Sequence, residues 1–130
     1  MINPETLFQL QILPELSQGE CHVFTWAVPE DLPYFDGHFP GNPVLPAIAV
    51  LDGTLEALKL LTGDKTISFE KIRTGKFLNI ITPGTVLRIR LTRIQGKGQC
   101  PNEWEAEWKS PTTQKIFAHL KLSLRSGGTN

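Results

Sequence analysis

Apolar and polar residues alternate with a period of two along the second half of the chain. Within residues 86–94, apolar side chains alternate with charged or polar ones, and residues 104–108 and 116–124 repeat the pattern. Such alternation is typical of strands that bury one face. Residues 66–77 form a further strand-like segment, and a Pro-Gly turn follows at 83–84. The second half therefore predicts four antiparallel strands.

The first half predicts two strands and one helix. One strand is expected over residues 7–13, which alternate partly and end at a proline. The other is expected over residues 20–28, which are rich in aromatic and β-branched residues and also end at a proline. The helix is expected over residues 46–61, with a proline at its first position and Gly63 as its stop. Because residues 47–51 are apolar all round the first turn, this end of the helix is expected to be buried on most sides.

The order of these elements predicts an α+β fold. A curved antiparallel sheet wrapped around one long helix satisfies the pattern. The chain has 130 residues, of which 40% are hydrophobic and 20% charged. These values fit one globular domain over residues 1–125, with a disordered tail over residues 126–130.

Three features of the chain predict a cytoplasmic protein. No apolar run approaches the roughly 20 residues that a membrane-spanning helix needs, so no membrane partner is expected. Residues 1–16 contain no Lys or Arg, unlike the start of a signal peptide. Cys21 and Cys100 lack the spacing of a metal or redox site, and they fit thiols in a reducing compartment.

Charge is distributed unevenly although the formal net charge is zero. Residues 1–58 hold eight acids and no Lys or Arg, whereas residues 59–100 hold nine bases and two acids. This asymmetry indicates a basic surface for an acidic partner. The alternative is that the two halves interleave in the fold and their fields cancel.

Residues 35–46 form a loop that is stiffened around His38. Its prolines stand at every third position and fix the backbone, while its two glycines permit unusual backbone angles on either side of the histidine (Pro40, Pro43, Pro46, Gly37 and Gly41). The stiffness favours a functional His38, because histidine exchanges a proton near neutral pH. The alternative is a histidine that fills a polar gap in a turn.

The start of the helix offers a second chemical element. With Pro46 as the first helical residue, Leu45 is the expected N-cap, and it has no side-chain acceptor. The N–H groups of the first turn then lack a local partner and attract an anion, unless a distant carbonyl or water fills that role.

Asp52 follows five apolar residues of this helix. Burial would disfavour its charged form and keep a proton available for donation. The alternative is a solvated edge, because Ile48, Asp52 and Glu56 share one stripe at helical spacing. Glu56 is expected to form a simple surface pair with Lys59.

Other chemistry is not predicted. His22 and His119 lie in strands without a comparable setting, and no pair of histidines has the spacing of metal ligands. The chain has no phosphate-binding glycine loop and no nucleophile elbow, so no metal or cofactor is expected. The basic strands lack a set of stacking aromatics, which disfavours nucleic acid as a partner.

Gly37-His38-Phe39-Pro40-Gly41-Asn42-Pro43-Val44-Leu45-Pro46, with Leu51-Asp52 beyond it, resembles the 3-hydroxyacyl-[acyl-carrier-protein] dehydratases of the FabA/FabZ type. The resemblance implies a hotdog fold and a homodimer with the active site at its interface. It also implies that His38 and Asp52 are catalytic. Asp at this position is typical of the FabA branch, whereas the loop is more similar to the FabZ branch.

Two positions depart from the family pattern. Ala47 stands where the family has glycine, and its N–H would bind the thioester oxygen. Gly53 stands where alanine is usual, and the glutamine that tends to follow is missing. These departures suggest a divergent relative that serves a specialised pathway, for polyenes or other secondary lipids.

The expected function is dehydration of a (3R)-3-hydroxyacyl thioester to the trans-2-enoyl thioester, in fatty-acid or related lipid biosynthesis. His38 would remove the C2 proton, the N–H groups of Ala47 and Ile48 would stabilise the enolate, and Asp52 would protonate the leaving hydroxyl. The expected partner is an acyl carrier protein, held by basic residues of the 71–97 stretch: Lys71, Arg73, Lys76, Arg88, Arg90 and Lys97. The alternatives are a hotdog thioesterase and a non-catalytic acyl- or carrier-binding module.

Overall fold

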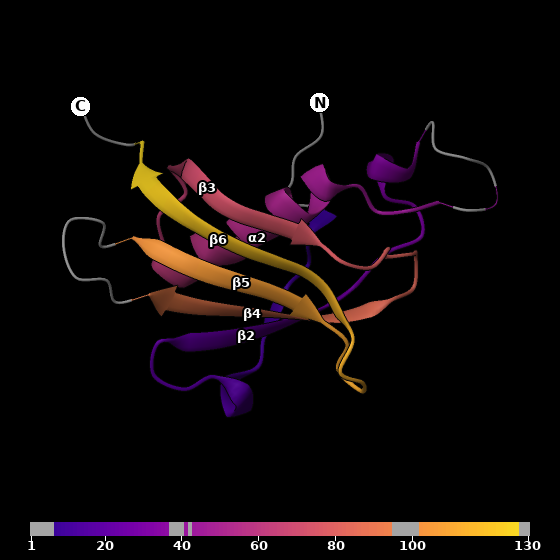
Figure 1. Cartoon of the computed structure of the whole chain (residues 1–130), viewed down its shortest axis with the longest axis horizontal. Helices are drawn as coiled ribbons and strands as arrows, with labels where there is room; N and C mark the ends of the chain where they lie inside the picture. The colour runs from indigo at the N-terminus through magenta and orange to yellow at the C-terminus, as the bar shows by residue number, and fades with distance from the viewer. Residues whose placement is uncertain (1–6, 37–40, 42, 95–101, 128–130) are drawn as a thin grey trace.

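A computed structural model describes residues 7–36, 41, 43–94 and 102–127 of the chain. These residues form one six-stranded sheet that curves around a single long helix, α2 (Ala47–Thr62) (Figure 1). Every pair of neighbouring strands is antiparallel, and the strand order is β1-β2-β4-β5-β6-β3. The predicted α+β architecture is confirmed. Over the same ranges, no helix combines the length and apolar character that crossing a membrane requires.

Except for β1, the strands lie close to the predicted segments. Their bounds are β1 (Gln11–Ile12), β2 (Cys21–Ala27), β3 (Ile67–Phe77), β4 (Val86–Ile94), β5 (Glu103–Lys109) and β6 (Ile116–Ser126). Two short 3-10 helices are also present. The first, η1 (Pro14–Leu16), precedes β2, and the second, η2 (Pro33–Phe35), precedes the loop that leads into α2.

The apolar positions that alternate along β4 and β5 form the sheet side of the hydrophobic core. Leu87, Ile89 and Leu91 are fully buried, and Ile89 lies opposite Trp108 of β5. The polar positions between them face away from α2, as the period of two requires. The prediction that β4 buries one face and exposes the other is therefore confirmed.

Gly53 allows α2 to approach the sheet closely. A Cβ atom added at Gly53 would lie 2.8 Å from Cη2 of Trp108 and 2.8 Å from Cε1 of Phe8. The Trp108 indole N–H donates to Thr54 Oγ1 (3.0 Å), and that hydroxyl donates to the Val50 carbonyl (2.8 Å). The large indole thus fills the room that an alanine side chain would need, which explains glycine at this position.

The first strand is much shorter than predicted. Residues 7–13 were expected to form it, but β1 covers only Gln11–Ile12. Residues 7–10 do not pair with β2, and the side chain of Phe8 is buried with its ring 4.8 Å from that of Trp26. Burial of one aromatic ring outweighs strand pairing here.

The predicted boundary of the C-terminal tail also changes. β6 includes Ser126, and the Gly127 N–H donates to the Thr66 carbonyl (3.1 Å), so both residues belong to the folded part of the chain. Residues 128–130 of the predicted tail lie outside the described residues.

Candidate active site

The start of α2 leaves backbone donors open. The N-cap is Pro46, not Leu45, so the helix begins one residue later than predicted. The Pro46 carbonyl accepts hydrogen bonds from the N–H groups of Ala49 (3.0 Å) and Val50 (3.4 Å), and no side chain caps the helix. Among the described residues, no acceptor pairs with the N–H groups of Ala47 and Ile48. These two donors and the positive end of the helix dipole favour an anion or a developing oxyanion.

The first turn of α2 is not buried on most sides, contrary to the prediction. Ala47 is exposed, and Ile48 keeps 56% of its surface accessible, whereas Ala49 and Val50 are buried. Only half of the turn packs against the sheet, so the apolar run includes residues that this chain alone does not cover.

An apolar groove of about 570 Å³ lies beside this helix end. Its walls come from the motif loop (residues 35–46), the first turn of α2, the end of β3 with the segment after it, and the start of β6. The lining residues are Val44, Leu45, Pro46, Ala47, Val50, Phe77, Leu78, Asn79, Ile80, Ile81 and Phe117. A larger hollow of about 730 Å³ lies along β2 and residues 7–11, and it is lined by none of the residues at the helix start. The groove is therefore the better candidate for an acyl chain.

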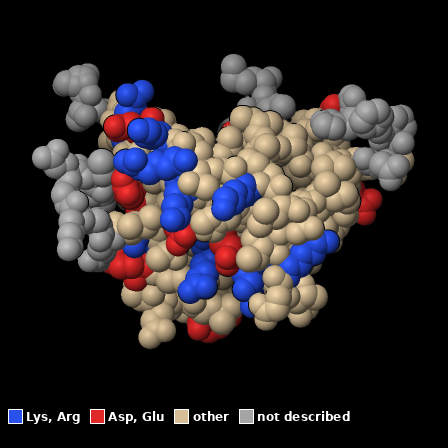
Figure 2. All heavy atoms as spheres, in the orientation of Figure 1, with Lys and Arg blue, Asp and Glu red and all other residues tan. Residues whose placement is uncertain are grey.

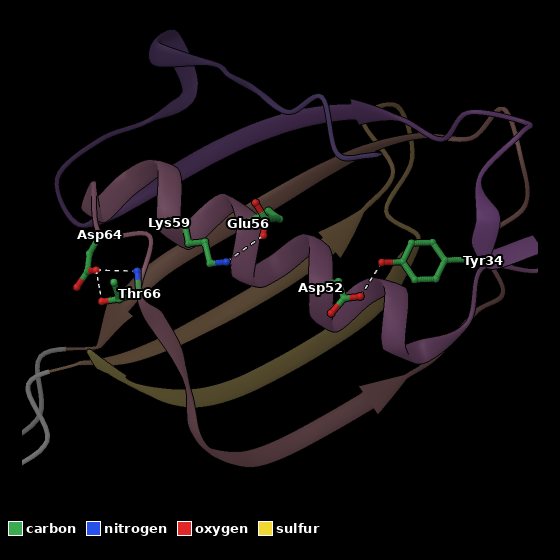
Figure 3. A network of polar contacts seen from close by, with 6 residues as sticks. All are labelled: Tyr34, Asp52, Glu56, Lys59, Asp64 and Thr66. Atoms are coloured by element: carbon green, nitrogen blue, oxygen red, sulfur yellow. Dashed lines mark hydrogen bonds and ion pairs between the residues drawn. The ribbon is translucent and has the colours of Figure 1, made fainter. Parts of the chain in front are cut away.

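Asp52 points toward Tyr34 of η2 (Figure 3). The Tyr34 hydroxyl donates to Asp52 Oδ2 at 2.6 Å, and both residues are half-buried. Burial, then the hydrogen bond to Asp52 and the negative charge of Asp52, raise the pKa of the Tyr34 phenol well above its ordinary value. Asp52 is therefore neither deeply buried nor on a solvated edge. Sequence reasoning missed Tyr34, and the available signal was that it is the single tyrosine, next to the stiff loop.

Glu56 lies one helical turn beyond Asp52. The predicted pair with Lys59 is present, with Nζ 3.3 Å from Oε2. It is not a simple surface pair, however, because only 7% of Glu56 is exposed. Lys59 thus compensates a carboxylate that the fold has largely removed from water.

The motif loop is described only in part. Gly37, His38, Phe39 and Pro40 lie outside the described residues, so the structure does not determine the distance between His38 and Asp52. Gly41 has a φ of 88°, a left-handed conformation that glycine adopts without strain. Pro43, Val44 and Pro46 lead into α2, and Val44 and Pro46 border the groove.

The predicted basic residues form two groups instead of one surface. Lys71, Arg73 and Lys76 lie on β3, whereas Arg88 and Arg90 lie on β4, with β5 and β6 between them. Lys97 lies outside the described residues. Figure 2 shows basic and acidic side chains interspersed on the sheet face turned away from α2.

Specific contacts account for part of this interspersion. Arg73 pairs with Glu103 of β5 (2.9 Å), and Arg90 Nε donates to the Cys21 thiol (3.1 Å). His119 lies 2.7 Å from Glu105 across neighbouring strands, which fits the structural role expected of it. Over the described ranges, no three His, Cys, Asp or Glu side chains converge to hold a metal ion.

The comparison with protein families agrees with the loop and the fold. A family model described as ApeI-like, ApeI dehydratase, matches residues 14–116, which include the whole motif and four of the six strands, β2 to β5. The chain belongs to this family. This placement confirms the resemblance to a divergent FabA/FabZ-type dehydratase.

Curated relatives carry the FabZ name. The chain is 34% identical over 116 residues to the 3-hydroxyacyl-[acyl-carrier-protein] dehydratase FabZ of Lactobacillus helveticus, covering 85% of this chain and 76% of that one. It is 31% identical over 93 residues to the FabZ of Anaplasma phagocytophilum, covering 65% of this chain. The aligned part spans only 64% of the Anaplasma protein and 59% of the FabZ of Lactiplantibacillus plantarum.

Solved structures share the fold. The dehydratase heterocomplex ApeI:P from Xenorhabdus doucetiae contains a chain with a TM-score of 0.67 at 20% identity, covering 84% of this chain and 90% of that one. An uncharacterised protein from Erwinia carotovora gives a TM-score of 0.68 at 24% identity, covering 95% and 99%. These similarities confirm the hotdog architecture.

Proposed function

We propose that this chain dehydrates a (3R)-3-hydroxyacyl thioester, carried on an acyl carrier protein, to the trans-2-enoyl thioester. The observation that carries the proposal is the start of α2, where the N–H groups of Ala47 and Ile48 have no partner among the described residues and an apolar groove lies alongside. A thioester oxygen on these donors would place its acyl chain along the groove. The names of the FabZ relatives support the same reaction class.

The reaction divides among three groups. His38 takes the C2 proton, and the N–H groups of Ala47 and Ile48 stabilise the charge that then develops on the thioester oxygen. Asp52 gives a proton to the C3 hydroxyl, which leaves as water. This is acid–base chemistry on an activated C2–H bond, and it requires no cofactor.

A second copy of the chain fits the exposed apolar surface. Among the described strands, β3 pairs only with β6, so its outer edge has open backbone groups. Ile72, Phe77 and Ile80 near this edge, together with Ile48, are exposed large apolar side chains. A homodimer would cover such a surface and bring the His38 loop of one copy to Asp52 of the other.

The carrier protein is proposed to bind beside β3. Lys71 and Lys76 are exposed on this strand, and Lys76 directly precedes Phe77 at the groove. An acidic carrier protein placed here would bring its phosphopantetheine arm to the open helix end. A cytoplasmic location remains part of the proposal, as does a single domain, which extends past the expected end at residue 125 to Ser126 and Gly127.

The test is turnover of 3-hydroxyacyl thioesters on acyl carrier protein, followed by formation of the conjugated enoyl product. His38→Ala and Asp52→Asn are each expected to lower kcat by about 100-fold or more, because each removes a general acid or base. His22→Ala is the matched control, since this half-buried histidine of β2 lies outside the proposed site. Undiminished dehydration by His38→Ala contradicts the proposal.

Thioester hydrolysis is the second candidate. Asp52 accepts a hydrogen bond from the Tyr34 hydroxyl. A carboxylate that activates a water molecule for attack on the thioester also acts as a hydrogen-bond acceptor, so the same contact fits hydrolysis. Release of free thiol without enoyl product, measured in the same assay, would assign the chain to hydrolysis.

A further inference from the structure

Tyr34 and Asp52 form a polar contact that the dehydration scheme above does not use. Tyr34 comes from η2, just before the motif loop, and Asp52 from the second turn of α2 (Figure 3). The phenol oxygen lies 2.6 Å from Oδ2, a short distance for a hydrogen bond between a hydroxyl and a carboxyl oxygen. The Tyr34 ring also packs 6.1 Å from the ring of Phe8, so the core supports the side chain that makes this contact.

The contact distinguishes the two oxygens of Asp52. Oδ2 accepts the phenol hydrogen, whereas no hydrogen bond from the described residues occupies Oδ1. A carboxyl group held through one oxygen is restrained in its rotation, which leaves Oδ1 as the oxygen available for proton transfer. The nearest further carboxylate on this stripe, Glu56, is paired with Lys59 and does not compete for the phenol.

We propose that Tyr34 is a positioning residue for Asp52, which it holds through Oδ2 so that Oδ1 delivers the proton to the leaving hydroxyl. This inference rests on the proposed dehydration. The proton on Oδ1 moves to the C3 oxygen, the C3–O bond breaks with its electron pair on that oxygen, and water departs. The electrons of the C2–H bond form the C2–C3 double bond as His38 takes the C2 proton.

The phenol contributes most while the proton is moving. Negative charge grows on the Asp52 carboxyl group as Oδ1 loses its proton, and a hydrogen bond to a charged acceptor is stronger than one to a neutral acceptor. The Tyr34 contact therefore stabilises the transition state more than the bound substrate. Such a contact raises kcat and leaves KM nearly unchanged.

The pair itself is tested without any turnover, because Tyr34 is the only tyrosine of the chain. Absorbance of the tyrosinate, followed as pH rises, reports the pKa of this one phenol. Asp52→Asn is expected to let Tyr34 ionise at lower pH than in the wild type, because burial, the bond to Asp52 and its charge together oppose ionisation. Glu56→Gln is the matched control: it removes a more remote carboxylate and is expected to shift the titration less. Identical Tyr34 titrations in the wild type and Asp52→Asn overturn the proposal.

Kinetics then test the role. Tyr34→Phe keeps the ring and removes only the hydroxyl, so kcat is expected to fall about 10-fold while KM stays within about twofold. In an Asp52→Asn background the same substitution should change kcat by less than about twofold, because Tyr34 acts through Asp52. An equal loss in both backgrounds overturns the positioning role. Absence of turnover in the wild type would instead reject the proposed dehydration, and the tyrosine titration would still report on the pair.

Discussion

The two ends of α2 are built in opposite ways. At the C-terminal end, Gly63 adopts a left-handed conformation with a φ of 72°, and its N–H donates to the Lys59 carbonyl (2.9 Å). Just beyond it, the Asp64 carboxylate accepts hydrogen bonds from the Thr66 N–H (2.8 Å) and the Ser126 hydroxyl (2.9 Å). At the N-terminal end, none of the described side chains caps the helix, and Ala47 and Ile48 are exposed.

The C-terminal end of α2 therefore contributes to the stability of the fold, whereas the N-terminal end is available for binding and catalysis. The closed end satisfies its own polar groups and ties α2 to the start of β3 and the end of β6. The open end keeps donors and apolar surface for something that binds. Variants at the two ends should therefore affect different measurements.

The largest effect is expected from Ala47→Pro. Proline is tolerated at the first helical position, and Pro46 already has the extended ψ of 161° that a following proline prefers. The variant thus deletes one N–H donor while the free energy of unfolding stays within about 0.5 kcal/mol. Steady-state kinetics should show kcat lowered by about 100- to 1,000-fold, the usual loss for one oxyanion donor.

Ala47→Val controls for the added bulk, because it retains the N–H. It should lose much less activity than Ala47→Pro. Equal losses in the two variants would mean that groove volume, and not the donor, is what matters at this position.

An intermediate effect is expected from Gly63→Ala at the closed end. The left-handed backbone of Gly63 costs an alanine about 1–2 kcal/mol, so urea denaturation should show that loss of stability while kcat is unchanged. Gly75→Ala is the control, because its φ is not positive and an added Cβ meets nothing closer than 3.6 Å. Destabilisation of similar size at both glycines would contradict the role given to the Gly63 cap.

The smallest effect is expected from Asp64→Asn, and it depends on pH. Hydrogen bonds from Thr66 and Ser126 hold the pKa of Asp64 below its ordinary value near 4 in the folded state. The native contact therefore stabilises the fold above that value, and its contribution is lost as pH falls through the lowered pKa.

Denaturation midpoints of the wild type and Asp64→Asn should thus differ at pH 7 and converge as the pH drops below about 4. A difference that stays constant over this range would show that the charge of Asp64 is not involved. Activity at neutral pH should match the wild type, since Asp64 is at the far end of α2 from Asp52 (Figure 3).

The sequence predicted most of the sheet because β4, β5 and β6 each bury one face, and a period of two reports this directly. It placed β1 incorrectly because the same alternation cannot distinguish a strand from a segment that buries one ring, Phe8, under α2. The helix start moved by one residue, which leaves the uncapped donors in place.

The sequence predicted the candidate site only for residues that lie close together along the chain. Ala47 and Asp52 stand on one helix and Pro46 is its N-cap, so their order along the site follows from the sequence. The contact of Tyr34 with Asp52 joins residues 18 positions apart, through a loop whose path no local rule specifies. The sequence also did not predict that Ile48 is exposed. An apolar pattern indicates that a surface is covered, but it does not indicate which chain covers it.

The order of strands in the sheet also has a consequence for how the chain is made. Among the described strands, β3 pairs only with β6, the last of them along the chain. Once α2 and β3 have been synthesised, the edge of β3 that pairs with β6 stays open until about 50 further residues have followed. The surface beside the open helix end is therefore among the last parts of the molecule to form.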